Sequence, residues 1–413
     1  MLSGHVVVVD LGYGDAGKGT VVDALCADGG RSAVIRFNGG AQAAHNVVAP
    51  DGRHHTFAQF GAGTLHGVRT HLSRFVAVDP LALAAEADHL TALGVPDPYA
   101  LLTVDGDAPL TTVWHRAANQ LRERRRGGDR HGSCGLGVGE TVSYALDHPD
   151  APCAADVRSP ARLRHRLTAV RDRLTDQLGD LGAPPVEEVA AVFEAFGRAV
   201  RIVDGPGTLR GLLTAGPCVF EGAQGVLLDE WFGWHPYTTW STTTFANAET
   251  LLAEAGQEAY RLGVVRTYTT RHGPGPLVTE DPALTAALPD PHNGVGPWQG
   301  AFRVGHFDAV AHRYAAEVAG GVHGLAVTHL DVPARVPELG ICASYGDWDR
   351  IVPGAQGDLA YQEALTARLA WARPERPERP DDWAGAIGKL LGAPVALESH
   401  GPTAADKRVT GDG

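Results

Sequence analysis

Gly12-Tyr13-Gly14-Asp15-Ala16-Gly17-Lys18-Gly19-Thr20 is a glycine-rich run with a single lysine, and it carries the strongest local signal in the sequence. Residues 5–9 before it form a β-branched run typical of a buried parallel strand, and residues 20–27 after it have helical spacing. A glycine-rich turn between a strand and a helix lets backbone N–H groups approach phosphate oxygens. The run therefore predicts a phosphate-binding loop, with a purely structural glycine turn as the alternative.

The loop departs from the ordinary P-loop pattern at its end, because Gly19 follows Lys18 directly and the hydroxyl comes one position later, at Thr20. Lys18 is informative because lysine is rare in this chain, which otherwise uses arginine. Asp15 is unexpected, since a carboxylate beside a triphosphate is repelled unless it binds a cation or moves a proton. A helix N-cap is the alternative interpretation of Asp15.

The rest of the chain alternates between strand and helix patterns. Strands are predicted at residues 32–37, 217–221, 263–268 and 325–330, and helices at residues 80–93, 160–178, 185–200, 246–262 and 308–318. This alternation favours one α/β domain over residues 1–413, with a central, mostly parallel sheet and peripheral helices. Residues 372–382 repeat Arg-Pro-Glu and predict an exposed, Pro-rich connector.

Composition excludes several classes of function. The net charge is −13, which argues against nucleic acid and anionic membranes as partners and leaves small anionic ligands possible. The five cysteines are scattered without zinc spacing, as expected of reduced thiols. The sequence has no signal peptide pattern and no apolar run long enough to span a membrane. We therefore expect a cytoplasmic protein that acts on small molecules.

Five later segments extend the signal of the loop and follow it in a fixed order along the chain. With the loop, they resemble the paired signatures of the adenylosuccinate synthetase family, and the resemblance runs over nearly the whole chain. The segments are Arg36-Phe37-Asn38-Gly39-Gly40-Ala41-Gln42-Ala43-Ala44-His45, Phe220-Glu221-Gly222-Ala223-Gln224-Gly225, Tyr268-Thr269-Thr270-Arg271, Thr328-His329-Leu330-Asp331 and Ser399-His400-Gly401-Pro402.

The resemblance implies a P-loop-like GTP-binding fold and a GTP-dependent ligase that forms C–N bonds. In such a reaction GTP phosphorylates an oxo or amide oxygen of an acceptor, and an amine then displaces phosphate. Asp15 is the expected general base and His45 the expected general acid, while Lys18 holds charge on the phosphates and Gln224 binds the acceptor oxyanion. The family also implies Mg²⁺, with Asp15 and Ala44 as its expected ligands, and a homodimer.

The resemblance assigns further residues to substrates. The acceptor is expected at Gln42, Ser133, Cys134, Gln224 and Thr239. Asp331 is expected to select guanine. The full set predicted to bind GTP is Gly14, Asp15, Ala16, Gly17, Lys18, Gly19, Thr20, His45, His329, Asp331, Ser399 and Gly401.

Four departures from the family pattern lie around the substrates. The arginine-rich loop for the amine donor corresponds to a stretch with Trp298, Gln299, Phe302 and Arg303, in which Arg303 is the one arginine left. The threonine-rich loop for the acceptor phosphate is replaced by residues 131–139. The family's phosphate-binding arginine falls near His148, the His-Asn pair is Ala41-Gln42, and the guanine-site lysine is His329.

These departures predict a paralogue that keeps the reaction and uses a different acceptor and amine donor. Three alternatives stay open. The first is an adenylosuccinate synthetase proper, which joins inosine monophosphate (IMP) and L-aspartate. The second is a GTP-dependent kinase that stops at the phosphorylated acceptor. The third is a GTP-binding protein without catalysis.

Overall fold

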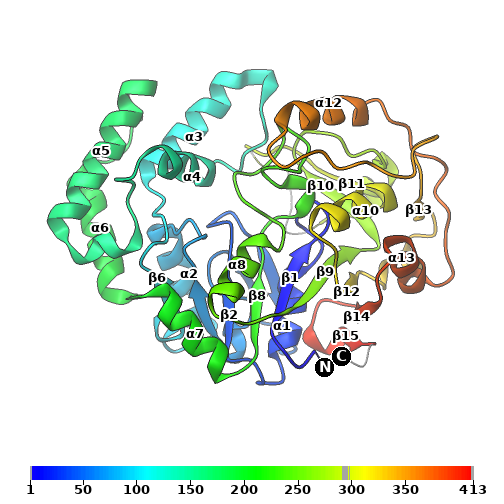
Figure 1. Ribbon diagram of the computed structural model, residues 1–413, viewed down its shortest axis with the longest axis horizontal. Helices are drawn as coiled ribbons and strands as arrows, with labels where there is room; N and C mark the ends of the chain where they lie inside the picture. The colour runs from blue at the N-terminus through cyan, green and yellow to red at the C-terminus, as the bar shows by residue number, and fades with distance from the viewer. Residues whose placement is uncertain (1, 291–295, 297, 411–413) are drawn as a thin grey trace.

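The computed structural model describes residues 2–290, 296 and 298–410, and its centre is a ten-stranded sheet (Figure 1). Neighbouring strands are parallel throughout, except that β15 runs antiparallel to β14 at one edge. In spatial order the strands are β15 (Lys407–Val409), β14 (Val395–Ser399), β12 (Gly324–Thr328), β9 (Tyr260–Arg266), β1 (Val6–Asp10), β8 (Cys218–Glu221), β2 (Ala33–Arg36), β5 (Arg69–Leu72), β6 (Leu102–Asp105) and β7 (Arg201–Val203).

Two smaller sheets and the helices surround this centre. One small sheet holds β10 (Tyr268–His272), β11 (Phe302–Asp308) and β13 (Ile341–Cys342), and the other pairs β3 (His45–Val48) with β4 (His54–Phe57). The helices are α1 (Lys18–Cys26), α2 (Pro80–Ala92), α3 (Val113–Arg126), α4 (Val138–Asp147), α5 (Pro160–Leu178), α6 (Val186–Ala199), α7 (Gly205–Ala215), α8 (Ala246–Glu254), α9 (Pro282–Ala287), α10 (Ala309–Val318), α11 (Val332–Arg335), α12 (Leu359–Leu369) and α13 (Trp383–Leu391).

The expected fold class, an α/β fold with a mostly parallel central sheet and peripheral helices, is confirmed. In Figure 1, α5 and α6 lie at one end of the molecule beyond β6, and α13 lies at the other end beside β14. Short 3-10 helices complete the structure at Thr64–His66, Pro98–Leu101, Gly127–Asp129, Ala154–Arg158, Val226–Leu228 and Ala404–Asp406.

Strand β1 shows how the sequence produces a buried sheet. All five of its residues are buried, and β8 and β9 pair with it in parallel on its two sides. Val6 and Val8 belong to one core cluster, whereas Val7 and Val9 belong to a second. Alternate side chains of a strand point to opposite faces of a sheet, so a continuous valine run serves both cores. Each fully buried valine stabilises the fold by about 1.5–3 kcal/mol.

The predicted helix at residues 246–262 is wrong in its second half. Helix α8 ends at Glu254, and Tyr260 already begins β9. Gly256 adopts a left-handed backbone with φ of 65°, a conformation that ends helices and that glycine adopts without steric cost. The predicted strand at residues 263–268 is likewise divided, because Thr267 separates β9 of the central sheet from β10 of the small sheet.

The parallel strands place the predicted loops at one edge of the sheet. β1, β9, β12 and β14 are consecutive neighbours, so their carboxyl ends lie side by side. The phosphate loop follows β1, and the segments that begin at His329 and His400 follow β12 and β14. Ligands of open α/β sheets bind beyond the carboxyl ends of the strands, so the functional site is expected at this edge.

Candidate active site

The loop between β1 and α1 is folded around the carboxylate of Asp10. One carboxylate oxygen accepts a hydrogen bond of 2.7 Å from the backbone N–H of Gly12, and the other accepts one of 2.8 Å from Ala16. Lys18 donates to the same carboxylate at 3.2 Å and to the carbonyl of Gly14 at 2.5 Å. Lys18 and Asp10 are both buried, so the ion pair holds the lysine beneath the loop.

Asp15 lies on this loop and is partly exposed. Its carboxylate makes no hydrogen bond within the described residues, so it is available to a ligand. Burial raises the pKa of Asp15, Arg266 and Lys18 act to lower it, and Asp10 adds to the rise. A carboxyl group with a raised pKa beside two cations suits proton transfer, as expected of a general base.

His45 begins β3 and pairs with Glu221 at the end of β8. Its Nδ1 lies 2.6 Å from Oε1 of Glu221, and the second oxygen of Glu221 accepts from the backbone N–H of Ala62 at 3.0 Å. Burial would raise the pKa of Glu221, but Arg36 and the His45 hydrogen bond outweigh it and hold the pKa low. A carboxylate only accepts, so Nδ1 of His45 carries the proton and Nε2 is left free.

Burial lowers the pKa of His45 to about 4, against the effect of Glu221. The imidazole is therefore neutral at pH 7 in the absence of a ligand. The negative charge of a bound triphosphate would raise this pKa again, because an opposite charge favours the imidazolium form. Protonation on ligand binding is what the predicted role of His45 as a general acid requires.

Gly19 explains the unusual end of the phosphate loop. A Cβ atom at this position would lie 2.7 Å from Cβ of His45 and 3.0 Å from its carbonyl carbon. A side chain at position 19 would therefore displace His45 from the first turn of α1. The glycine after Lys18 allows the predicted acid to pack directly against the phosphate loop.

Two amide side chains lie at the double glycine that follows β2. An added Cβ at Gly39 would lie 3.4 Å from Oε1 of Gln224, and one at Gly40 would lie 3.2 Å from Oε1 of Gln42. Gln224 has a left-handed backbone with φ of 57°, uncommon outside glycine. Both ends of each amide are buried without a hydrogen-bond partner in the described part of the chain. Such groups cost free energy unless a ligand satisfies them.

The remaining residues predicted for the acceptor lie in two loops. Ser133 donates to Oδ1 of Asn119 at 2.9 Å and accepts from the backbone N–H of Gly135, so it stabilises the loop of residues 131–139. Burial raises the pKa of the Cys134 thiol. Thr239 is tied to Leu228 through its backbone N–H, at 2.8 Å. His148, near the expected phosphate-binding position, packs on the ring of Tyr144 with centroids 4.4 Å apart.

The residues predicted for the amine donor pack mainly against neighbouring loops. The ring of Trp298 lies under the guanidinium of Arg124 at 5.1 Å, and Gln299 lies against Gly273, where an added Cβ would be 2.8 Å from the Gln299 carbonyl oxygen. Phe302 contacts His272 edge to face at 6.0 Å.

The guanidinium of Arg303 already has partners within the protein. It forms an ion pair of 2.7 Å with Glu280 and donates to the carbonyls of Gly273 and Gly275. The one arginine of this loop is therefore neutralised, and a dicarboxylate would have to displace Glu280 to reach it.

The segments predicted to hold the nucleotide base meet at the same edge of the sheet. Leu330 donates through its backbone N–H to the carbonyl of Ser399 at 3.0 Å, and Thr20 of α1 donates to the carbonyl of Pro402 at 2.8 Å. Ser399 donates to the carbonyl of Gly401 at 3.3 Å. Asp331 pairs with Arg335 at 2.7 Å and is partly exposed. The structure thus brings these segments next to the phosphate loop.

Both ring nitrogens of His329 form hydrogen bonds within the protein. Its Nε2 lies 2.7 Å from Arg266, and its Nδ1 lies 2.9 Å from the hydroxyl of Thr328.

Metal ligands are scarce in the described residues, where no group of three or more His, Cys, Asp or Glu side chains is arranged to hold an ion. Asp15 presents a carboxylate without a hydrogen bond, and Ala44 lies on the exposed surface directly before His45. Mg²⁺ prefers oxygen ligands and often takes one carboxylate together with substrate phosphates. This donor set fits an ion that arrives with a nucleotide and does not fit a resident metal.

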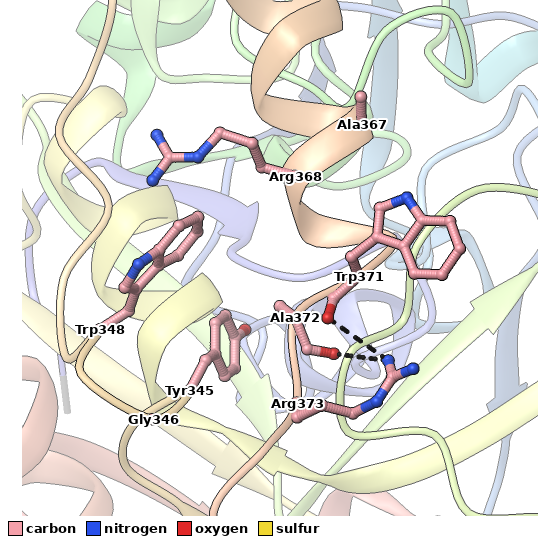
Figure 2. Close-up of a pocket in the computed structure, with 8 residues that line it drawn as sticks. All are labelled: Tyr345, Gly346, Trp348, Ala367, Arg368, Trp371, Ala372 and Arg373. Atoms are coloured by element: carbon pink, nitrogen blue, oxygen red, sulfur yellow. Dashed lines mark hydrogen bonds between the residues drawn. The ribbon is translucent and has the colours of Figure 1, made fainter.

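A separate hollow of about 600 Å³ contains none of the predicted site residues (Figure 2). Figure 2 shows Trp348 and Trp371 on opposite sides of it, and the guanidinium of Arg368 lies 4.0 Å above the ring of Trp348. Trp371 is 79% exposed. The hollow is lined by Tyr345, Gly346, Trp348, Ala367, Arg368, Trp371, Ala372 and Arg373.

Three residues of the site were missed from the sequence. Asp10, Glu221 and Arg266 each end a buried strand, and each contacts a predicted site residue or acts on its charge. Each of them could have been found from the sequence as a charged residue at the carboxyl end of an apolar strand. In a parallel sheet these ends lie at the site.

A family model described as adenylosuccinate synthetase matches residues 7–406. The adenylosuccinate synthetase of Neisseria meningitidis serogroup C (strain 053442) is 33% identical over 422 aligned residues, which cover 96% of each chain. The enzyme of the same name from Myxococcus xanthus (strain DK1622) is 32% identical, again with 96% of each chain covered.

Solved structures share the fold. The fully ligated adenylosuccinate synthetase from Plasmodium falciparum matches with a TM-score of 0.84 and 20% identity, over 98% of this chain and 100% of that one. Cyanophage S-2L succinoaminodeoxyadenylate synthetase (PurZ), bound to dGMP and to dATP as an energy donor, matches with a TM-score of 0.62 and 20% identity. That match covers 99% of this chain and 96% of the phage protein.

Proposed function

Because the chain belongs to the adenylosuccinate synthetase family, we propose that it is a divergent paralogue that keeps the phosphoryl-transfer chemistry and uses a different acceptor and amine donor. As a member of this family, the chain is a GTP-dependent ligase that forms a C–N bond. The proposal concerns the two substrates that are joined.

The pairing of Arg303 with Glu280 carries the proposal. L-Aspartate has two carboxylates, and such groups are recognised best by bidentate arginines. In this chain the donor loop has one arginine, and its charge is already balanced by an ion pair of 2.7 Å. Trp298 and Phe302 make the rest of the loop aromatic. The loop suits an amine donor with less negative charge than aspartate.

The acceptor side supports the same conclusion. Ser133 is committed to Asn119, and Gln42 replaces the asparagine of the family pattern with a longer amide. The unpartnered amides of Gln42 and Gln224 suit an acceptor that presents both hydrogen-bond donors and acceptors, such as a lactam or amide, a class that includes the base of IMP. The cyanophage protein PurZ, which binds dGMP, provides a precedent for a changed acceptor on this fold.

The proposed roles of the catalytic residues follow from their surroundings. Asp15 removes a proton from the acceptor, so that the oxygen can attack the γ-phosphorus of GTP. His45, backed by Glu221, donates its proton to the transferring group, and Lys18 offsets charge on the phosphates. Gln224 donates to the acceptor oxygen. Mg²⁺, held by Asp15, the carbonyl of Ala44 and the nucleotide, would neutralise phosphate charge when bound.

The alternative, adenylosuccinate synthetase proper, is favoured by the 33% identity to enzymes of that name over 96% of the chain. It requires Glu280 to release Arg303 to the aspartate carboxylates. By family membership we also propose a cytoplasmic homodimer with a single domain per chain. No helix in the described residues is long and apolar enough to cross a membrane.

Calorimetric titration of the protein with a non-hydrolysable GTP analogue, and then with IMP and L-aspartate, tests the proposal. We expect the analogue to bind, and we expect neither IMP nor aspartate to show saturable binding below about 1 mM, the upper end of common substrate affinities. Tight binding of both would favour adenylosuccinate synthetase proper. Failure of the GTP analogue to bind would contradict the assignment of the nucleotide site.

A further inference from the structure

Arg266, the last residue of β9, is a buried cation. It is 5% exposed and forms no ion pair within the described residues. Its guanidinium donates to the hydroxyls of Thr270 and Tyr268, at 3.1 and 2.8 Å, and to Nε2 of His329, at 2.7 Å. All three partners are neutral, and its Nε is buried with no partner in the same set of residues. Asp15 interacts with this charge through space but forms no ion pair with it within the described residues. A buried cation held only by neutral groups is costly, so a bound anion would stabilise it.

The direction of the hydrogen bonds around His329 can be assigned from Arg266. A guanidinium only donates, so Nε2 of His329 accepts and Nδ1 carries the proton. Nδ1 then donates to the hydroxyl of Thr328 at 2.9 Å, and this hydroxyl donates to the carbonyl of Ala16 at 2.7 Å. One directed chain of hydrogen bonds therefore joins the cation to the phosphate loop.

Two further observations support this arrangement. His329 has φ of 58°, a left-handed conformation that costs a non-glycine residue free energy and that is kept only where the surroundings require it. Burial and the charge of Arg266 lower the pKa of His329 well below its usual value, so the imidazole stays the neutral acceptor that the chain requires.

The register of the sheet places Arg266 at the phosphate site. It pairs with Thr328 of β12, and two residues earlier Val264 pairs with Asp10 of β1. Arg266 therefore lies beside the first residues of the phosphate loop. It is also the strongest of the cations that act on Asp15, ahead of Lys18. Arg266 and Lys18 therefore both act on the carboxylate of Asp15.

We propose that Arg266 is a second phosphate-binding cation of the nucleotide site, held in place by His329 as a neutral acceptor. The inference rests on the proposed nucleotide site and adds a residue to it. His329 consequently contacts the protein and does not bind the base, although a lysine is expected at this position in the family pattern. The ligand chemistry is a polyphosphate, because the hydrogen-bonded chain ends on the phosphate loop and not on the donor loop.

The test measures the affinity of three probes, GTP, GDP and inorganic tripolyphosphate, by calorimetry. Arg266→Gln should weaken GTP and tripolyphosphate binding by about 10- to 100-fold, as expected for the loss of a charge-assisted contact. Arg266→Lys keeps the charge. It should restore at least half of the change in log Kd that Arg266→Gln causes. Arg261→Gln is the matched control. Arg261 lies near the other end of the same strand, β9, and forms an ion pair with Glu249.

Variants of His329 separate this proposal from a role in base recognition. His329→Gln retains an acceptor for Arg266 and should bind GTP within about threefold of the wild type, whereas His329→Lys places two cations together and should weaken both GTP and tripolyphosphate. Tighter GTP binding by His329→Lys, or unchanged tripolyphosphate binding by Arg266→Gln, would overturn the proposal. A wild-type protein that binds tripolyphosphate but not GTP would contradict the proposed function and leave the role of Arg266 supported.

Discussion

Glu221 controls the protonation state of His45. It is fully buried at the end of β8, and its two oxygens accept from His45 and from the backbone N–H of Ala62. It therefore fixes the tautomer of His45 and supplies the negative charge that an imidazolium at this position requires. Burial alone would keep His45 neutral, so its proposed role as an acid depends on Glu221 and on the charge of the ligand.

The Glu221→Gln substitution should lower kcat by about 10²- to 10⁴-fold, because the amide no longer stabilises the imidazolium. The affinity for GTP should change by less than about threefold, since Glu221 does not face the nucleotide in the proposed site. Phosphate release from GTP gives kcat, and calorimetry gives the affinity. Turnover equal to that of the wild type would remove His45 from the proposed mechanism.

The contact between α1 and β3 is the junction that assembles the proposed acid with the phosphate loop. Helix α1 begins at Lys18, and β3 begins at His45, so the first turn of the one lies against the first residue of the other. The contact depends on the missing side chain of Gly19, because an added Cβ would lie 2.7 Å from Cβ of His45.

Gly19→Ala should therefore displace His45 and lower kcat by about 10²-fold, the scale expected for a misplacement of about 1 Å. Gly211→Ala is the matched control, because Gly211 also lies in a helix, α7, and an added Cβ there meets nothing within 4 Å. The control should keep full activity and gain slightly in stability, since alanine favours helices by about 1 kcal/mol over glycine. Equal activities of the two variants would contradict the packing argument.

The elements near the site differ in how well the sequence predicts them. The strand, loop and helix around residues 6–26 were predicted because a valine run, a glycine turn and a helical pattern are local signals. The division of residues 246–268 into α8, β9 and β10 was not, since the helical pattern continues locally and only the sheet recruits Tyr260. The engagement of Arg303 by Glu280 and of His329 by Arg266 depends on residues distant in the sequence, which no local pattern contains.

At the scale of the whole molecule, buried histidines tie stability to pH. His71 on β5 is 1% exposed and bonds to the hydroxyl of Thr103 at 3.0 Å. Burial lowers its pKa to about 4. The unfolded chain therefore takes up a proton near pH 6.5, before the folded chain does, so stability is lost as pH falls from about 6.5 to 4.

His71 alone should account for a loss of about 3 kcal/mol in the free energy of unfolding across this range. Urea denaturation at several values of pH between 7 and 4 measures the loss. In His71→Gln the dependence on pH should be smaller by that amount, although the variant is less stable at pH 7. A pH dependence identical to that of the wild type would show that the pKa of His71 is the same in the folded and unfolded chains.

We propose that this ligase transfers phosphate from GTP by the chemistry of its family and joins an acceptor and an amine other than IMP and L-aspartate. The most direct measurement is the release of GDP and phosphate from GTP and Mg²⁺, with and without IMP and L-aspartate, together with the mass of the product. We expect the protein to bind GTP and to form no adenylosuccinate, because turnover requires another carbonyl or amide acceptor with another amine. Release that depends on both IMP and aspartate, with a product of the mass of adenylosuccinate, would contradict it.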